Sequence, residues 1–531
     1  MSPREQAEQL STDDVVALIE RSAEIEERQA ALAERNAELE RQLDWLKRQL
    51  FGRKSEQLLH LDTSHQPTLG EGVLPAPQEP EDQTTTVAAH ARRSKPSRKP
   101  GEPRLQFDED VPVEEIVVED ESLAGLDPDS YALVDHKVSY RLLQNPATYQ
   151  IVKLLRPVTK HRDGSFSCPP LPAEVFEGSH ADASFLAGLA IDKCRYHLPL
   201  YRQHQRLESS GIHIDRGTLT RYMQRMAEHL APIVESQLGS ILQSRVLAID
   251  ETPIKAGRKA KGKMKQSYIW PLLGDQEEIV FHFAPSRGRM VIDRLLAGFT
   301  GTLVNDGYTA YESYCKANEG VVRAQCWVHA RRQFVKAESV EPELVRAALR
   351  KIGKLYELQE SLGDDPTMEE IQELRAGQMK PLVEGFFEWL REQLDERALL
   401  PSNPFDQAAQ YVLDRVDALR VFLEDPAVPM DTNHLEREIR PIAVGRKNWL
   451  FCWKEAGAQQ LSILYSLIST CRLQGIDPYT YLVDVLQRVN THPIRRVHEL
   501  TPRHWKETFS DNPLPSLMEL VQEKRRAESK A

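Results

Sequence analysis

The sequence of 531 residues lacks the marks of several common protein classes. Its six cysteines are scattered and form no C-x-x-C pair, which argues against a zinc cluster or a disulfide framework and favours a reducing compartment. It has no apolar run long enough to span a bilayer, and its first residues do not resemble a signal peptide. We therefore expect a cytoplasmic protein without a membrane partner.

The chain also lacks a uniform positive charge. Its formal net charge is −12, which argues against a basic coat that covers the whole surface. The charge is uneven, which leaves room for DNA binding at a local surface. The basic clusters lie at residues 92–99, 255–265, 331–332 and 446–447, and an acidic stretch spans residues 108–129. The length of the chain predicts several domains.

The N-terminal part predicts a long helix followed by a tether. Apolar residues recur every seven positions, at Leu18, Ile25, Leu32, Leu39 and Leu46. This heptad pattern predicts a coiled coil over residues 12–52 that joins two or more copies of the chain, and Asn36 on the seam fits a parallel dimer. A single amphipathic helix packed on its own chain is the alternative. Residues 61–104 have the composition of a disordered linker, whose basic end either contacts DNA or is solvated.

Two modules are expected before the middle of the chain. Residues 131–143 and 148–158 are rich in β-branched and aromatic side chains, so residues 105–170 predict a small β module. Residues 180–237 predict a helix-turn-helix, with helices over 199–207 and 216–230 and a tight turn at 211–214. Its second helix offers side chains suited to DNA contacts, namely Arg216, Thr218, Arg221 and Arg225.

The pattern then changes to strands that alternate with helices. Five strands are expected, at residues 245–249, 267–273, 278–284, 301–305 and 321–327. This order predicts a multidomain α+β protein whose catalytic domain is a mixed α/β sheet of the ribonuclease-H type, with the first and fourth strands side by side. The domain would comprise residues 244–335 and 431–475, interrupted by a helical insertion at 338–430. Residues 476–531 predict a C-terminal helical region.

Three acids lie in contexts that suit metal-dependent chemistry on phosphate esters. Asp250 and Asp306 each end an apolar strand, and Glu436 opens a basic helix. Two divalent cations, Mg²⁺ or Mn²⁺, can be held by few carboxylates and can activate both oxygens of a phosphodiester exchange. Each acid alone is more typical of a turn or a solvated helix. Their combination in one α/β pattern favours a site in which Asp250 bridges the two ions.

Neighbouring residues complete this hypothesis. Glu251 and Glu438 are alternatives by spacing, although adjacent strand residues face opposite sides, so we expect Asp250 and Glu251 to lie apart. Residues 255–265 predict a hairpin loop, which either contacts DNA or is solvated. We expect Trp327 to lie in the core, whereas Trp449 could stack on an unpaired base. Further DNA contacts are expected from His329, Arg331, Arg332, Arg437, Arg446 and Lys447.

Several motifs resemble those of one family. They comprise Leu50–Glu56, His197–Gln203, Ile249–Thr252, Asp306–Tyr308, Cys326–Phe334, Asn433–Arg437 and Arg440–Phe451. The chain resembles transposases of the insertion-sequence-66 family, of the DDE class. The resemblance selects Glu436 over Glu438. It implies a ribonuclease-H-like domain with a helical insertion, recognition of terminal inverted repeats, and small accessory proteins of the same element.

One departure from the family concerns zinc. Members commonly carry a cysteine-rich zinc module before the helix-turn-helix, but here that region holds only Cys168, with His136 and His161. These are too few ligands at the wrong spacing, so the β module is expected to fold without zinc.

The sequence thus predicts a DNA transposase that cleaves and joins DNA at inverted repeats. A ribonuclease-H-like nuclease or resolvase without strand transfer, and an inactive DNA-binding relic, are the alternatives.

Overall fold

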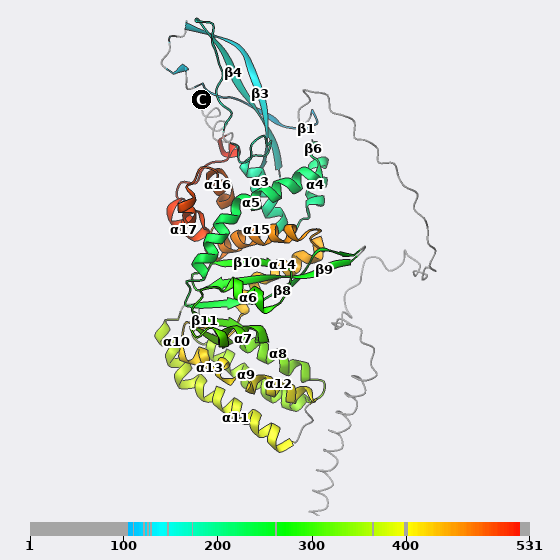
Figure 1. Ribbon diagram of the computed structural model, residues 1–531, viewed down its shortest axis with the longest axis vertical. Coiled ribbons are helices and arrows are strands. Elements are labelled where there is room, and N and C mark those ends of the chain that lie inside the picture. The colour runs from blue at the N-terminus through cyan, green and yellow to red at the C-terminus, as the bar shows by residue number, and fades with distance from the viewer. Residues whose placement is uncertain are drawn as a thin grey trace, which may run out of the picture. The chain divides into compact units, whose positions relative to one another are not determined.

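The computed structural model describes residues 105–520, except for residues 110, 121–122, 125–126, 128–129, 146–147, 173, 261–262, 364–365 and 398–401. The coiled coil expected at 12–52 and the linker expected at 61–104 lie outside the described residues, and both stay predictions. The described part is a mixed α/β fold (Figure 1). None of the helices in it is long and apolar enough to cross a membrane.

The β module is a small sheet in the order β2-β4-β3, with β5 beside β4. The strands are β2 (Val113–Val117), β3 (Tyr131–Asn145), β4 (Thr148–His161) and β5 (Phe166–Ser167). Both predicted strands are confirmed as β3 and β4. His136 and His161 face Pro157 and Tyr131 across the ladder, four rows or about 13 Å apart, so they cannot share one ion.

A helical region follows the β module. It contains α3 (Ala183–Cys194), α4 (Leu200–Ser209) and α5 (Arg216–Ile241). Between α4 and α5, residues Ile212–His213 form β6, which pairs with β1 (Gln106–Phe107), and Gly211 takes a positive φ of 71° that permits the sharp turn. The predicted tight turn therefore includes a short strand, and α5 runs eleven residues past its predicted end at Leu230 because its apolar face continues into the core.

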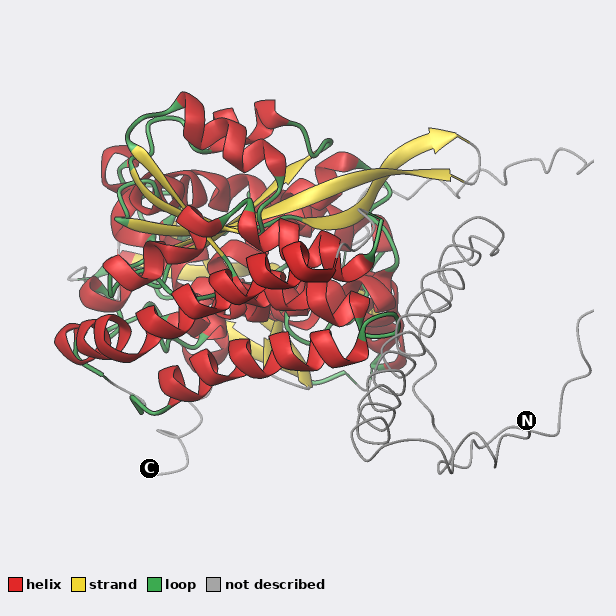
Figure 2. Cartoon of the chain, turned by 90° about the horizontal axis from the view of Figure 1, so that it is seen from below, coloured by secondary structure: helices red, strands yellow, loops and turns green. Residues whose placement is uncertain are grey.

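The central sheet has the order β10-β9-β7-β11-β12, with β8 beside β9. Its strands are β7 (Val246–Ile249), β8 (Thr252–Ala260), β9 (Lys263–Gly274), β10 (Ile279–Ala284), β11 (Gly301–Asn305) and β12 (Val321–Gln325). The five predicted strands are confirmed, except that the fifth, expected to reach Trp327, ends at Gln325 and Trp327 begins a helix. Strands β7 and β11 are parallel neighbours as expected. Helices lie on both sides of the strands (Figure 2). They include α6 (Arg289–Leu295), α7 (Thr309–Ala317) and α8 (Trp327–Ala337).

The prediction of a hairpin loop at residues 255–265 is wrong. These residues mostly belong to β8 and β9, which form an antiparallel hairpin from Thr252 opposite Ile269 to Ala260 opposite Lys263. The run of lysines suggested a solvated loop, yet Ile254 and Ala256 are buried on one face of the strand. The hairpin extends beyond the helices in both Figure 1 and Figure 2.

The outer strand β10 is covered by α15 (Glu455–Leu473), so its backbone donors are not left open. The N–H of Phe281 donates to Ser466 Oγ at 2.9 Å, and the N–H of Ile279 donates to Thr470 Oγ1 at 3.1 Å. Gln237 of α5 donates both to Thr470 Oγ1 and to the Ile279 carbonyl, each at 2.7 Å. These bonds fix α5 and α15 to the same edge of the sheet.

The described part of residues 338–430 consists of helices joined by turns and short irregular segments. The elements are α9 (Pro342–Glu360), α10 (Met368–Leu374), the π-helix η3 (Arg375–Met379), α11 (Lys380–Arg397), α12 (Pro404–Leu413) and α13 (Val416–Glu424). Trp327 of α8 is fully buried against this block and donates from Nε1 to the Leu419 carbonyl at 3.1 Å, as a core residue should. The chain then returns to the sheet through α14 (Asn433–Trp449) and α15. It ends, within the described residues, with α16 (Pro478–Arg488), η4 (Ile494–Leu500) and α17 (Pro502–Thr508).

Candidate active site

Asp250 lies where one long strand is interrupted. Strands β7 and β8 keep the same register against β9, and the interruption between them comprises Asp250 and Glu251. The residue of β9 opposite Asp250 is Pro271, which has no N–H to donate. The N–H of Asp250 reaches the Pro271 carbonyl only at 3.4 Å. The regular alternation of side chains therefore stops at this point.

Asp250, Glu251 and Asp306 converge at the carboxyl ends of β7 and β11. One carboxylate oxygen of each lies within 4.8 Å of the others. The prediction that Asp250 and Glu251 lie apart is wrong, because strand geometry has ended and Asp250 Oδ1 accepts the N–H of Glu251 at 2.7 Å. Tyr311 of α7 donates to Glu251 Oε2 at 2.7 Å, and Arg287 forms ion pairs with both Glu251 and Asp306.

Helix α14, which follows the helical block in the sequence, brings Glu436 close to Asp250. The N–H and the hydroxyl of Thr432, just before the helix, both donate to Cys326 Sγ at 3.3 Å. This contact joins the start of α14 to the end of β12. Glu436 lies in the first turn of α14 and therefore faces the carboxyl ends of the strands.

A second group of potential ligands consists of Asp250, His329 and Glu436, again with atoms within 4.8 Å of one another. Arg332 donates from Nη2 to Glu436 Oε2 at 2.5 Å and from Nη1 to His329 Nε2 at 3.2 Å. The other carboxylate oxygen, Glu436 Oε1, is buried and accepts no hydrogen bond from the described residues. A buried acceptor without a donor fits a position at which a cation binds.

The electrostatics of the site also favour a cation. Burial, together with repulsion from Asp306, Glu251 and Glu436, raises the pKa of Asp250 to about 7. Burial and the charge of Asp306 likewise raise the pKa of Glu251 to about 7, against the opposing effect of its hydrogen bonds. Burial lowers the pKa of His329, which keeps the imidazole neutral and able to bind a metal through nitrogen.

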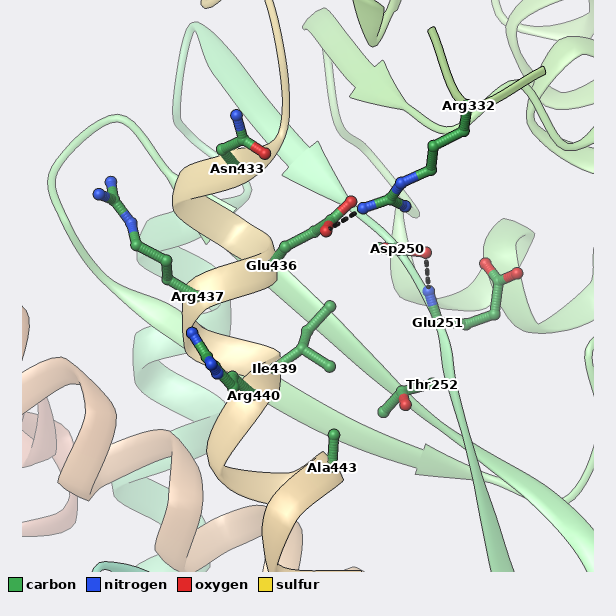
Figure 3. A pocket seen from close by; sticks show the side chains of 10 residues that line it. All are labelled: Asp250, Glu251, Thr252, Arg332, Asn433, Glu436, Arg437, Ile439, Arg440 and Ala443. Atoms are coloured by element: carbon green, nitrogen blue, oxygen red, sulfur yellow. Dashed lines mark hydrogen bonds and ion pairs between the residues drawn. The ribbon is translucent and has the colours of Figure 1, made fainter. Parts of the chain in front are cut away.

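Asp250, Glu251 and Glu436 line a pocket of about 580 Å³ between the β7–β8 junction and α14, and Asp306 is not among the residues that line it. Figure 3 shows Glu436 and Arg332 pointing toward each other beside Asp250, whereas the side chain of Arg437, which also lines the pocket, extends away from Asp250. Arg440 also lines the pocket, and both Arg437 and Arg440 are exposed. Arg331 is exposed on α8 beside Arg332. Cationic side chains therefore surround an acidic centre.

The residues predicted on the helix-turn-helix lie elsewhere, and none of them lines this pocket. Arg216 and Arg221 are exposed on α5, where Arg221 Nη2 donates to Thr218 Oγ1 at 2.7 Å. Arg225 is half-buried, with its guanidinium 4.6 Å from the centre of the Phe176 ring. This stacking means that Arg225 contributes to packing. Arg216 is exposed, and its guanidinium lies 5.6 Å from the centre of the Tyr201 ring.

The last turn of α14 differs from the prediction. Arg446 donates to Thr252 Oγ1 at 3.3 Å and to the Pro253 carbonyl, so it fixes α14 to β8, while Lys447 is exposed. Trp449 is half-buried against the core, and Lys193 lies 5.9 Å above its ring. The indole is therefore packed inside the chain and poorly placed to stack on a base.

Sequence reasoning missed three contributors to the site. It set Glu251 aside on strand alternation, and it did not consider Arg287 or Tyr311. Pro271 gave no usable signal for Glu251, because only the folded sheet places it opposite Asp250. Arg287 and Tyr311 carried no local signal, since only the folded sheet brings them to Glu251.

Two carboxylates that follow parallel strands and one from the first turn of a helix, rimmed by arginines, have the arrangement that phosphate chemistry requires. Comparison with known proteins agrees with this class. The Transposase IS66 family matches residues 178–460, the IS66 C-terminal element matches 466–503, and the pattern described as Transposase C of IS166 homeodomain matches 38–116. The chain belongs to the IS66 family of transposases, which are enzymes that act on DNA.

Curated relatives extend over nearly the whole chain. The uncharacterized protein y4hP of Sinorhizobium fredii is 27% identical over 499 residues, covering 87% of this chain and 88% of its own. The uncharacterized protein y4jD of the same organism is 28% identical over 495 residues, covering 87% of this chain and 93% of its own. The similarity therefore includes the β module and the helical block as well as the site.

Proposed function

We propose that this transposase is of the DDE type, cleaving DNA at the terminal inverted repeats of an insertion sequence and joining the ends to target DNA. Asp250, Asp306 and Glu436 are its catalytic acids. The proposal depends above all on one observation, the convergence of carboxylates from β7, β11 and the first turn of α14. The order of the strands and the helical block between Asp306 and Glu436 support a ribonuclease-H-like domain with an insertion.

The residues present fit two divalent cations, Mg²⁺ or Mn²⁺. Asp250, Glu251 and Asp306 would hold one, and Asp250, His329 and Glu436 the other, so that Asp250 is shared. When bound, the ions supply positive charge to the attacking and leaving oxygens of the phosphodiester. Oxygen ligands suit Mg²⁺, and Mn²⁺ also accepts the imidazole nitrogen.

The chain's own side chains do the remaining work. Tyr311 and Arg287 hold the Glu251 carboxylate by a hydrogen bond and an ion pair, which fixes its orientation. Arg332 holds one oxygen of Glu436. The exposed guanidinium groups of Arg331, Arg437 and Arg440 and the ammonium of Lys447 are free to bind phosphates on either side of the reacting one. No side chain needs to act as a covalent nucleophile.

DNA-end recognition belongs to α4 and α5 in this proposal. The exposed Arg216 and Arg221, with Thr218, would contact the inverted repeat, as in a helix-turn-helix. The coiled coil at residues 12–52 would join two copies, and accessory proteins of the element would assist. Arg225 is not included, because its guanidinium stacks on Phe176.

A cleavage and strand-transfer assay tests the proposal. We expect wild-type protein with Mg²⁺ or Mn²⁺ to nick inverted-repeat DNA and to join it to a target. Asp250→Asn, Asp306→Asn and Glu436→Gln should each lower the rate by at least about a thousandfold, while Asp293→Asn, an exposed acid of α6, should not. Undiminished cleavage by Asp306→Asn would refute the site. Nicking without joining would identify a nuclease instead.

A further inference from the structure

Three large apolar side chains are exposed in the short loop that follows α14. Leu450 is 64% exposed, Phe451 37% and Trp453 61%. The rings of Phe451 and Trp453 lie 5.7 Å apart at an interplanar angle of 41°. Large aromatic side chains are usually buried, so a cluster of them on the surface usually marks a binding site.

The backbone holds this loop in a fixed conformation. The N–H of Cys452 donates to the Lys255 carbonyl at 2.9 Å, and the Cys452 carbonyl accepts the N–H of Gly257 at 3.1 Å. Cys452 faces the core, so its neighbours Phe451 and Trp453 face outward. Leu450 has a positive φ of 63°, a strained conformation for a residue with a side chain. Phe451 and Trp453 are therefore held beside β8 in one conformation, and binding a ligand does not require the loop to become ordered first.

Positive charge surrounds the aromatic pair. The guanidinium of Arg258 lies 5.6 Å from the centre of the Trp453 ring. Glu455, two residues after Trp453 in the sequence, is already paired with Lys265 at 2.9 Å. The described residues of 253–266 and 446–454 include no Asp or Glu, and the cations among them are Lys255, Arg258, Lys259, Lys263, Lys265, Arg446, Lys447 and Lys454. An occupant of this surface must therefore carry negative charge as well as flat apolar groups.

Two elements lead from the acids to this surface. Figure 3 shows α14 and the strand that begins at Thr252 running side by side away from Asp250 and Glu436. From Glu436 to Trp449 the helix advances about 20 Å. Arg446 bonds α14 to Thr252, which lines the acidic pocket, so the two elements keep a fixed separation.

We propose that Phe451 and Trp453 stack on unpaired bases of the DNA strand whose reacting phosphate lies at the acids. This inference rests on the proposed function and adds that the enzyme holds its DNA with bases unpaired near the site. Single strands offer base faces for stacking and phosphates for the surrounding cations, whereas the bases of an intact duplex are stacked on one another. A purely apolar protein partner would leave the cations uncompensated.

Binding to DNA without catalysis tests the inference. Full-length protein that carries Asp306→Asn, without divalent cations, is titrated into a labelled single strand of about 20 nucleotides and into the matching blunt duplex, at one salt concentration. Adding Phe451→Ala and Trp453→Ala should weaken binding to the single strand by about tenfold or more and change duplex binding by less than about twofold. Trp453→Phe should retain most of the affinity, because it keeps a ring.

Phe166→Ala is the matched control. Phe166 is 61% exposed and has Lys160 5.9 Å from its ring centre, yet it belongs to β5 of the β module. It should bind both probes like the parent. Equal loss on both probes, or no loss on the single strand, would overturn the inference. A change in oligomeric state of the double variant without DNA would overturn it too, by identifying a protein interface. Cleavage by the wild-type chain is read separately, so failure of stacking and failure of the proposed function are distinguishable.

Discussion

Asp250 shows at the scale of one residue how a site for cations costs stability. It lies half-buried beside three other carboxyl groups, and no basic side chain of the described residues forms an ion pair with it. Arg287 pairs with Glu251 and Asp306, and Arg332 pairs with Glu436. The metal-free fold must therefore hold an uncompensated charge, which a bound cation would stabilise.

Replacing Asp250 by Asn should stabilise the cation-free protein. Its pKa rises from 3.8 to about 7 on folding, so the folded state binds a proton more tightly and loses stability as the pH increases from about 4 to 7. At pH 8 in a chelator, Asp250→Asn should increase the free energy of unfolding by roughly 2–4 kcal/mol, and the gain should vanish near pH 4. Thermal melts measure this. Asp293→Asn is the control, and equal melts of wild type and Asp250→Asn at pH 8 would contradict the prediction.

His329 supplies a second test at the residue scale, because it was expected to contact DNA and instead lies with Asp250 and Glu436. If it is a ligand, His329→Ala should bind one of the two Mn²⁺ ions at least about tenfold more weakly and leave the other unchanged. Calorimetric titration with Mn²⁺ measures both. Arg331→Ala, an exposed cation two residues away, should bind Mn²⁺ like the wild type. Unaltered Mn²⁺ binding by His329→Ala would show that His329 is not a metal ligand and would favour the expected DNA contact.

At the scale of elements, the strands were predictable and their interruption was not. Apolar runs such as Val246–Ile249 and Gly301–Asn305 are local signals, so β7 and β11 and their adjacency followed from the sequence. The break at Asp250 depends on Pro271 of a different strand, which local periodicity does not include. The sequence does not distinguish Trp449 from Trp453. Only the folded structure shows that Trp449 packs beneath Lys193 while Trp453 is exposed.

The contact between α15 and β10 gives a prediction about elements. Thr470 and Ser466 accept the outward N–H groups of β10, so removing both hydroxyls leaves buried donors without acceptors. Thr470→Val with Ser466→Ala should lower the free energy of unfolding by roughly 2–4 kcal/mol in a denaturant titration. Ser462→Ala should change it by less than about 1 kcal/mol, because that hydroxyl donates only to the Ala458 carbonyl of its own helix. Equal effects of the two changes would show that the edge of β10 does not need α15.

At the scale of the whole molecule, the helical block is part of the site. It separates Asp306 from Glu436 by more than a hundred residues in the sequence, yet it contacts the loop that carries Asp306. Tyr411 of α12 donates to the Asp306 carbonyl at 2.7 Å, and Arg415 reaches the Gly307 carbonyl at 3.4 Å. Hydrophobic periodicity predicted helices in this block but not this contact, because a phenol and a carbonyl leave no mark in that periodicity.

Tyr411→Phe should therefore weaken cation binding from a distance. Its hydroxyl also accepts from Gln325 at 2.9 Å, so it holds the Asp306 loop against the end of β12. Without it, the Asp306 carboxylate is less well fixed, and Mn²⁺ affinity should fall by about tenfold with a loss of roughly 1 kcal/mol in the free energy of unfolding.

Tyr314→Phe removes an equivalent bond, from a phenol to the Leu296 carbonyl at 2.7 Å, away from the acids. It should reduce stability alike but leave Mn²⁺ affinity unchanged. If both variants lose Mn²⁺ affinity equally, the effect reflects general loosening, and the helical block has no specific hold on the second acid.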